Sequence, residues 1–260
     1  MVVLIPKHKK PFAIMGAILA KENPMILEKT YNASCVLCFS GGQDSTTLAL
    51  WAKKAFSATH LLAFDYAQKH AIELEQAQKI AGLLNLPLKI LDVRFLQEIT
   101  LSALFANHPQ KSHAPHPQNP DLPASFVPDR NALFFTLAHA YAFNLGADFV
   151  LVGVSQQDYS GYFDCRAAFL ESLQTSLNLG AFGVPEGITF LAPFMQMSKA
   201  QEFGLARDLG GLDFVLEYTH TCYEGVRGVR HAYGYGCGVC PACQLRQAAY
   251  QEFLEHYKQN

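Results

Sequence analysis

One junction constrains the fold of this chain more than any other feature. An apolar run at residues 35–39 ends in a polar hexapeptide, and helical periodicity follows, with Leu48, Ala52 and Ala55 on one face. The hexapeptide reads Ser40, Gly41, Gly42, Gln43, Asp44 and Ser45. A strand, a glycine turn and a helix in this order direct the free N–H groups of the helix start into the turn, where glycine lets an anion approach closely. The junction therefore predicts a phosphate site, and residues 40–45 are called the phosphate loop below.

The phosphate loop lacks the lysine of the GxxxxGK[ST] motif. It resembles instead the SGGxDS pyrophosphate loop of the N-type ATP pyrophosphatases, which split ATP into AMP and pyrophosphate while activating a carbonyl oxygen. An ordinary turn is the alternative for the GG-x-D portion alone, because glycine and aspartate are common turn residues. The whole hexapeptide between a strand and a helix favours a nucleotide site.

Apolar strands alternate with amphipathic helices through the middle of the chain. We expect strands at residues 34–39, 60–64, 88–93 and 149–154, and helices at residues 45–58, 71–84, 96–105 and 131–145. This alternation predicts an α/β fold with a doubly wound, mostly parallel sheet and helices on both faces. Ligands in such sheets bind beyond the carboxyl ends of the strands, where the phosphate loop, residues 65–68 and residues 155–164 would meet.

Length and charge limit the domain organisation and the partners. The chain has 260 residues, half of them apolar, which suffices for one large α/β domain or two small ones. A net charge of −2 argues against bulk nucleic acid as the main partner, and no apolar run approaches the ~20 residues of a membrane helix. We expect an N-terminal extension at 1–33, partly ordered at best, a nucleotide-binding domain at 34–215, and a metal-binding region with a C-terminal helix at 216–260.

Four of the seven cysteines cluster late in the sequence, at Cys222, Cys237, Cys240 and Cys243. The last three form a C-x-x-C-x-x-C stretch that one short loop can wrap around a metal, and four thiolates around Zn²⁺ give a closed structural site. An iron–sulfur cluster is the alternative, but the ferredoxin pattern needs a further cysteine where Gln247 stands. Such clustering indicates a reducing compartment, and we expect a cytoplasmic protein.

The remaining cysteines and the nearby histidines have simpler interpretations. Cys35 and Cys38 would face opposite sides of a strand and are predicted to be small core residues. Cys165 is predicted to be buried rather than nucleophilic. His220 and His231 are alternative metal ligands, although four cysteines need no help.

Two loops and two cations are candidates for recognition. The stretch 158–166 is dense in rings that can stack on a heterocycle, carboxylates that can accept from a guanine-like edge, and a guanidinium that can hold an anion. Its candidates are Asp158, Tyr159, Tyr162, Asp164 and Arg166.

Lys199 would follow an N-cap at Ser198, against the helix dipole, which calls for compensation such as a phosphate. Arg130 would begin another helix and is a second candidate to bind a phosphate. The proline-rich stretch 106–128 is either a lid or a solvated loop. For each of these loops and cations, an ordinary role on the protein surface is the alternative.

These features together are similar to the 7-cyano-7-deazaguanine synthase family. The matching stretches lie at residues 39–45, 64–70, 127–131, 158–166, 198–200, 222–225 and 237–243. The resemblance implies an adenine nucleotide alpha-hydrolase-like fold and a ligase that forms C–N bonds. It further implies conversion of 7-carboxy-7-deazaguanine, ammonium and ATP to a nitrile in queuosine biosynthesis, with Mg²⁺ and Zn²⁺, usually as a homodimer and without a stable nucleic-acid partner.

The resemblance also suggests residue roles. The phosphate loop would bind ATP together with Phe39, Asp65 and Gln68. Asp44 would be a Mg²⁺ ligand, and Lys199 and Arg130 would offset charge that develops at the phosphates.

Several positions depart from the family pattern. Asp129 stands where glycine is usual, Phe163 stands where proline is usual, and the gap between Cys222 and Cys237 is longer. These differences bear on the shape of the substrate pocket rather than on the reaction class. The rival functions are a tRNA sulfurtransferase or lysidine synthetase on the same scaffold, and a zinc-ribbon module that binds nucleic acid through Arg227, Arg230 and His231.

Overall fold

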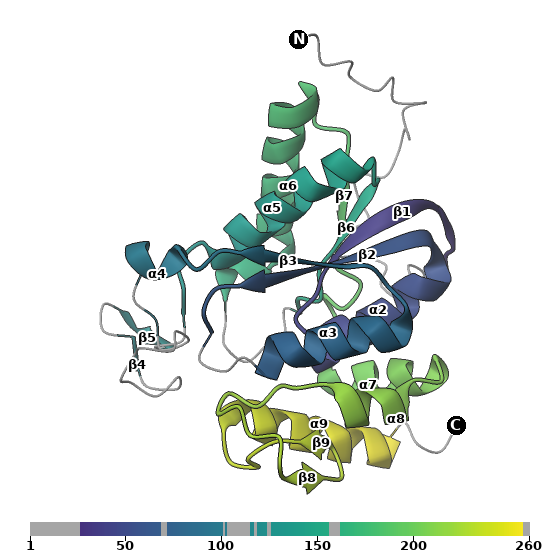
Figure 1. The fold of residues 1–260 in the computed structure, drawn as a ribbon, viewed down its shortest axis with the longest axis vertical. Coiled ribbons are helices and arrows are strands. Elements are labelled where there is room, and N and C mark those ends of the chain that lie inside the picture. Colours follow the sequence, from purple (N-terminus) through teal and green to yellow (C-terminus); the bar gives the residue numbers. More distant parts are fainter. Residues whose placement is uncertain are drawn as a thin grey trace.

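A five-stranded parallel sheet forms the centre of the molecule (Figure 1). The computed structural model describes residues 27–68, 72–100, 102, 115–116, 119–123, 126–155 and 162–256. In spatial order the strands are β3 (Leu88–Asp92), β2 (Phe56–Asp65), β1 (Tyr31–Cys38), β6 (Phe149–Leu151) and β7 (Thr189–Leu191). All neighbouring pairs are parallel. The strand order reverses at β1, so the crevice beyond its carboxyl end is the expected place for a ligand.

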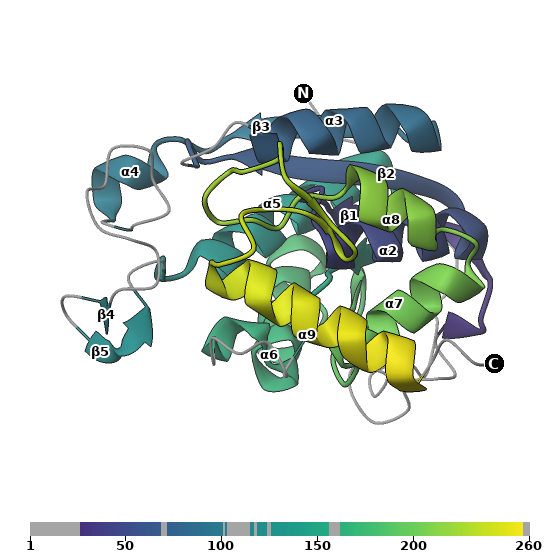
Figure 2. The ribbon, with the colours of Figure 1, turned by 90° about the horizontal axis from the view of Figure 1, so that it is seen from below.

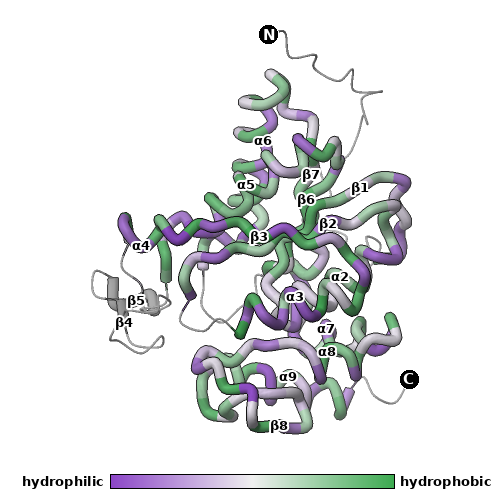
Figure 3. The backbone as a smooth tube through the Cα atoms, in the orientation of Figure 1, coloured by the Kyte–Doolittle hydropathy of each residue, from purple (hydrophilic) through white to green (hydrophobic). Residues whose placement is uncertain are grey.

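Helices cover both faces of the sheet, as the sequence predicts. One face carries α2 (Gln43–Ala55) and α3 (Ile72–Leu84), and the other carries α5 (Arg130–Leu145) and α6 (Ala167–Phe182) (Figure 1). Successive residues of β1 supply the two cores, because Val36 packs on one side while Leu37 packs on the other. Figure 3 shows the resulting hydrophobic stretches in the central strands and mixed hydropathy along the helices.

Tertiary packing moves several boundaries away from their predicted positions. The helix expected at 45–58 spans Gln43–Ala55, because Phe56 instead begins β2 and stacks on Tyr31 with ring centroids 4.5 Å apart. β6 ends at Leu151, three residues before the predicted end. Helix α4 (Leu96–Ile99) is shorter than the helix expected at 96–105. The sequence reading missed β7 and α6.

The proline-rich stretch contains a short hairpin, β4 (Pro115–His116) and β5 (Asn119–Pro123). Its described residues are not helical, as predicted, and most of the stretch lies outside the described residues. The lid stays a prediction.

The C-terminal part packs below α2 and α3. It comprises α7 (Lys199–Asp208), α8 (Leu212–Tyr218), a hairpin of β8 (Arg230–His231) and β9 (Gly234–Tyr235), and α9 (Pro241–His256). Helix α9 lies across α7, where Phe203, Val215 and Phe253 are fully buried in a shared core (Figure 2). The expected division at 34–215 and 216–260 stays a prediction, and its boundary falls inside α8. Among the described helices, none has both the length and the apolar character that a membrane span requires.

Candidate functional site

The phosphate loop connects β1 to α2 and has a backbone that only glycine accommodates at one position. Gly41 has φ +78°, and a Cβ placed on it would lie 2.8 Å from the main-chain nitrogen of Ala77 in α3. Gly42 is the N-cap of α2. The N–H groups in the first turn of any helix have no partner within that helix, so the turn presents donors to an incoming anion.

Hydrogen bonds inside the phosphate loop fix its shape. Ser40 N donates to Ser45 Oγ at 3.3 Å, Gly42 N donates to Ser40 Oγ at 3.3 Å, and Thr46 N donates to Gly42 O at 3.0 Å. Gly153, just after β6, comes close to the loop, because a Cβ placed there would lie 3.5 Å from Ser45 N. The sequence reading did not single out Gly153, although its position after an apolar strand was a usable signal.

The structure brings Asp44 and Lys199 together. Lys199 Nζ donates to Asp44 Oδ2 at 2.8 Å and to Glu202 Oε1 at 3.3 Å. The predicted N-cap is confirmed, since Ser198 Oγ accepts from Gln201 N at 3.2 Å in a capping box. The capping box sets the start of α7 and with it the position of Lys199. The carboxylates of Asp44 and Glu202 therefore offset the unfavourable position of the Lys199 charge at the start of α7, for which the sequence had suggested a phosphate.

Electrostatics keep Asp44 ionised. Partial burial acts to raise the pKa of this carboxyl, but the ammonium of Lys199, a hydrogen bond shared with Glu202, a hydrogen bond from Lys199, and the guanidinium of Arg246 together hold the pKa below its usual value. An ionised carboxylate beside a phosphate loop has the oxygen chemistry that Mg²⁺ prefers. Glu202 and Arg246 were not among the predicted site residues.

Asp65 and Gln68 form a tight turn at the end of β2. Asp65 Oδ1 accepts from Ala67 N at 3.0 Å, and Gln68 Oε1 accepts from Tyr66 N at 3.1 Å. Phe39 is only 2% exposed, and its side chain packs in the core beneath the phosphate loop. A contact between Phe39 and a nucleotide would therefore involve its main chain.

Arg130 lies at the start of α5 and faces a second group of polar residues. The preceding residue, Asp129, has φ +59°, which accounts for the glycine usual at this position. Burial raises the pKa of Glu73 to about 7, and the charge of Arg130 opposes that rise. Burial and the charge of Glu73 also raise the pKa of Tyr66. The sequence reading missed Glu73, which no motif marks.

The stretch 158–166, called the recognition loop below, is described only in part, because Asp158 and Tyr159 lie outside the described residues. The Arg166 guanidinium lies over the ring of Phe163, 4.5 Å from its centroid, and Phe163 is 64% exposed. Tyr162 stacks on Phe126 with centroids 5.8 Å apart. Asp164 lies between them in the short helix η1 (Phe163–Cys165). The rings and charges are thus presented near the carboxyl end of the sheet, while their ligand contacts stay predictions.

The predicted cysteines do come together. The ligand atoms of Cys222, Cys237, Cys240 and Cys243 all lie within 4.8 Å of one another. Zn–S bonds of about 2.3 Å in a tetrahedron place sulfur atoms about 3.8 Å apart, so the spacing fits a four-thiolate zinc site. Cys240 N donates to Cys237 Sγ at 3.3 Å and Cys237 N donates to Cys222 Sγ at 3.4 Å. Such N–H groups stabilise thiolate charge.

Both histidines near the cluster contact main-chain oxygens. His220 Nε2 lies 3.1 Å from Cys222 O, and His231 Nε2 lies 3.1 Å from Gly236 O. Each histidine thus contacts main chain at or next to a cysteine ligand, and neither belongs to the group of four residues that could hold a metal. The longer segment between Cys222 and Cys237 contains the β8–β9 hairpin.

The remaining cysteines behave as predicted. Cys35 and Cys38 pack on opposite sides of β1, and Cys165 is buried against Asn131, whose Nδ2 lies 3.6 Å from its sulfur.

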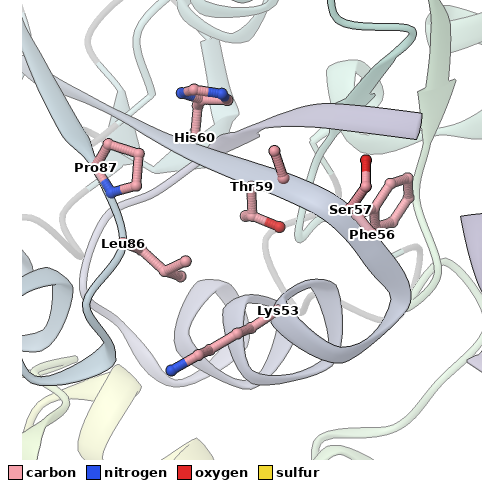
Figure 4. Close-up of a pocket in the computed structure, with 8 residues that line it drawn as sticks. Lys53, Phe56, Ser57, Thr59, His60, Leu86 and Pro87 are labelled. Atoms are coloured by element: carbon pink, nitrogen blue, oxygen red, sulfur yellow. The ribbon is translucent and has the colours of Figure 1, made fainter. Parts of the chain in front are cut away.

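A hollow of about 250 Å³ lies away from these groups, at the amino end of β2 (Figure 4). It is lined by Lys53, Phe56, Ser57, Ala58, Thr59, His60, Leu86 and Pro87. It contains none of the predicted site residues, and Lys53 Nζ donates to Leu84 O at 2.7 Å. We regard it as a surface feature of the sheet edge.

The five-stranded parallel sheet, the phosphate loop after β1 and the C-terminal four-cysteine cluster define an α/β protein with a candidate phosphate site and a candidate metal site. Residues 34–254 match the family described as "Queuosine biosynthesis protein QueC". This chain belongs to that family.

Related proteins match almost end to end. A 7-cyano-7-deazaguanine synthase of Helicobacter pylori (strain Shi470) is 56% identical over 224 residues, covering 86% of this chain and 98% of that protein. A protein of the same name from Wolinella succinogenes is 46% identical over 222 residues, covering 85% and 94%. Among solved structures, an NH3-dependent NAD synthetase from Campylobacter jejuni has a TM-score of 0.43 at 18% identity, covering 74% of this chain and 70% of that one.

Proposed function

We propose that the chain is an ATP-dependent ligase that converts 7-carboxy-7-deazaguanine and ammonia to 7-cyano-7-deazaguanine in queuosine biosynthesis. The observation that carries this proposal is the 56% identity to a 7-cyano-7-deazaguanine synthase over 98% of that protein. The phosphate loop, with Lys199 Nζ 2.8 Å from Asp44 Oδ2 beside it, supports the use of a nucleoside triphosphate.

The chemistry requires activation, because a carboxylate would have to expel oxide when ammonia attacks. Attack of the substrate carboxylate on the α-phosphate of ATP releases pyrophosphate and makes AMP the leaving group. Ammonia then displaces AMP to give the amide and a proton. A second ATP activates the amide oxygen in the same way, with release of pyrophosphate, and loss of AMP and a proton leaves the nitrile.

The phosphate loop would bind the β- and γ-phosphates through its main-chain donors. Asp44 would hold Mg²⁺, which screens the negative charge of the phosphate oxygens when bound. Lys199 and Arg130 would offset the charge that develops as pyrophosphate leaves. The contact of Lys199 with Asp44 supports this role for Lys199, and Arg130 would act from the start of α5.

The recognition loop would hold the deazaguanine, with ring stacking from Tyr159 and Tyr162 and hydrogen bonds from the carboxylates of Asp158 and Asp164. Arg166 would bind the substrate carboxylate or a nucleotide phosphate. Zn²⁺ in the cysteine cluster would be structural, because four thiolates leave no open position. We further propose that the protein is a cytoplasmic homodimer and has no stable nucleic-acid partner.

Mass spectrometry of the product tests the reaction. Zinc-loaded protein is incubated with ATP, magnesium, ammonium and 7-carboxy-7-deazaguanine, and the nitrile should form with two AMP and two pyrophosphate per product. Asp44→Ala should lower turnover by at least about 100-fold, whereas Asp92→Ala, at an exposed carboxylate that pairs with Arg94, should leave it unchanged. Turnover of Asp44→Ala within twofold of the parent would remove the phosphate loop from the chemistry.

A further inference from the structure

One segment of main chain joins the phosphate loop to the cysteine cluster. Residues 219–222, called the connecting segment below, run from the end of α8 to the first metal ligand. His220 N donates to Gly41 O at 3.1 Å, and a Cβ placed on Gly42 would lie 3.5 Å from His220 O. Two residues later, Cys222 supplies its sulfur to the cluster. The chain that supports the glycine turn is therefore continuous with a metal ligand.

Arg246 of α9 holds the connecting segment in place. Its Nη1 donates to Thr221 Oγ1 at 3.2 Å, and its Nη2 donates to Thr219 Oγ1 at 2.8 Å and to Val215 O at 3.2 Å. The side chain is only 4% exposed, and hydrogen bonds from a buried guanidinium are strong and directional. Arg246 follows Cys243 by one turn of the same helix, so α9 provides both a metal ligand and this clamp.

Neighbouring residues are arranged around the guanidinium. Gly234 leaves space for it, because a Cβ placed there would lie 2.9 Å from Arg246 Nη2. Arg227 adds a further hydrogen bond to the connecting segment, from its Nη1 to Thr219 O at 2.9 Å. The charge of Arg246 also attracts Asp44 in the phosphate loop. The cluster, the clamp and the loop thus form one connected set of contacts.

We propose that Arg246 is a positioning residue for the nucleotide, and that through it metal occupancy of the cysteine cluster and nucleotide affinity of the phosphate loop are coupled. The inference rests on the proposed function, because it takes the loop to bind a triphosphate. If the metal-bound cluster favours the loop geometry that binds nucleotide, then nucleotide must favour metal retention by the same factor. Loss of the clamp should weaken both effects.

Calorimetry with the β,γ-imido analogue of ATP and magnesium tests the clamp on zinc-loaded protein. Arg246→Gln should keep its zinc but bind the analogue about tenfold more weakly, with Arg246→Lys between it and the parent. Arg230→Gln is the control, because Arg230 is an exposed arginine of the same region that pairs with Glu217. The Arg230→Gln variant should bind the analogue with the affinity of the parent. Equal affinities of Arg246→Gln and the parent would overturn the coupling. A parent that binds no analogue would instead reject the proposed function.

A second measurement follows zinc release to a chromogenic chelator. The analogue should slow release from the parent severalfold, and this protection should vanish in Arg246→Gln; protection of equal size in both would also overturn the coupling. If Arg246→Gln does not fold, the acceptor side is changed instead. Thr221→Val removes the hydroxyl that accepts from Arg246 and should weaken analogue binding about threefold, while Thr221→Ser keeps it and should bind like the parent. Parent-like binding by Thr221→Val would contradict the proposal.

Discussion

The phosphate loop and the cysteine cluster are each encoded by a short stretch of sequence, but their geometries have different origins. In the cluster, three of the four sulfur ligands lie within residues 237–243, and a bound metal would itself hold them together. In the phosphate loop the binding groups are main-chain donors, and the backbone is held by Ala77, Gly153 and His220 from distant parts of the chain. The comparison teaches that ligand chemistry shapes the cluster, whereas tertiary packing shapes the loop.

Removing a metal ligand should have the largest effect on the protein. Cys240→Ser should lose bound zinc and about 4 kcal/mol or more of the free energy of unfolding, because metal binding and folding of such sites are linked. Elemental analysis and urea unfolding measure both quantities. Cys35→Ser changes a buried cysteine outside the cluster and should keep a full equivalent of zinc. Zinc retained by Cys240→Ser would mean that the metal does not depend on four thiolates.

Closing the space at Gly41 should damage the loop without removing any side chain. Gly41→Ala combines a left-handed backbone with a 2.8 Å clash against Ala77 N, and we expect kcat/KM to fall about 100-fold, equivalent to ~3 kcal/mol. The matched control is Gly82→Ala in the same helix as Ala77, where a Cβ meets nothing within 4 Å. The control should gain up to ~1 kcal/mol of stability and keep its activity. Near-parent activity of Gly41→Ala would show that packing does not set the loop geometry.

The Asp44–Lys199 pair should give the loop a dependence on pH. Asp44 has a lowered pKa in the folded protein, so its contribution to stability is present above the unfolded pKa and is lost as pH falls through the folded pKa. Lys199→Met removes the main counter-charge, so the pKa of Asp44 should rise and acid unfolding should begin at higher pH, with a cost of about 1 kcal/mol at neutral pH. Thermal unfolding between pH 3 and 7 measures this. The double variant Lys199→Met with Asp44→Asn should lose the additional pH dependence of stability that Lys199→Met introduces. If the stability of Lys199→Met falls with decreasing pH in the same way as that of the parent, the pairing is refuted.

The smallest expected effect concerns the backbone before Arg130. Asp129→Gly relieves a non-glycine residue at φ +59° and should stabilise the fold by at most ~1 kcal/mol. Asn85→Gly is the control, since Asn85 has φ +53° at an exposed turn far along the chain. Denaturant unfolding should show similar gains for both, while a change in KM for ATP is expected only for Asp129→Gly. A loss of stability in Asp129→Gly alone would indicate that the aspartate side chain has a structural role.

Much of the fold and half of the site follow from local sequence patterns. The strands next to the phosphate loop are apolar runs, the glycine pair marks the turn, and the cysteine spacing marks the cluster. β7 was missed because it is short and is fixed by pairing with β6. α6 was missed although its sequence begins with apolar residues and offered a helical signal. Glu73, Glu202 and Arg246 were missed because their significance lies in burial and in partners from other elements, which no spacing in one sequence reveals.

The hydrogen bond from His220 N to Gly41 O has a consequence for biosynthesis. The residue that supports the turn follows all five strands of the central sheet in the sequence, so it is synthesised long after β1, α2 and β2. A ribosome-bound chain that stops before His220 therefore contains the motif but lacks this hydrogen bond. We expect a competent triphosphate site to arise only once the connecting segment and α9, which carries Arg246, have been synthesised.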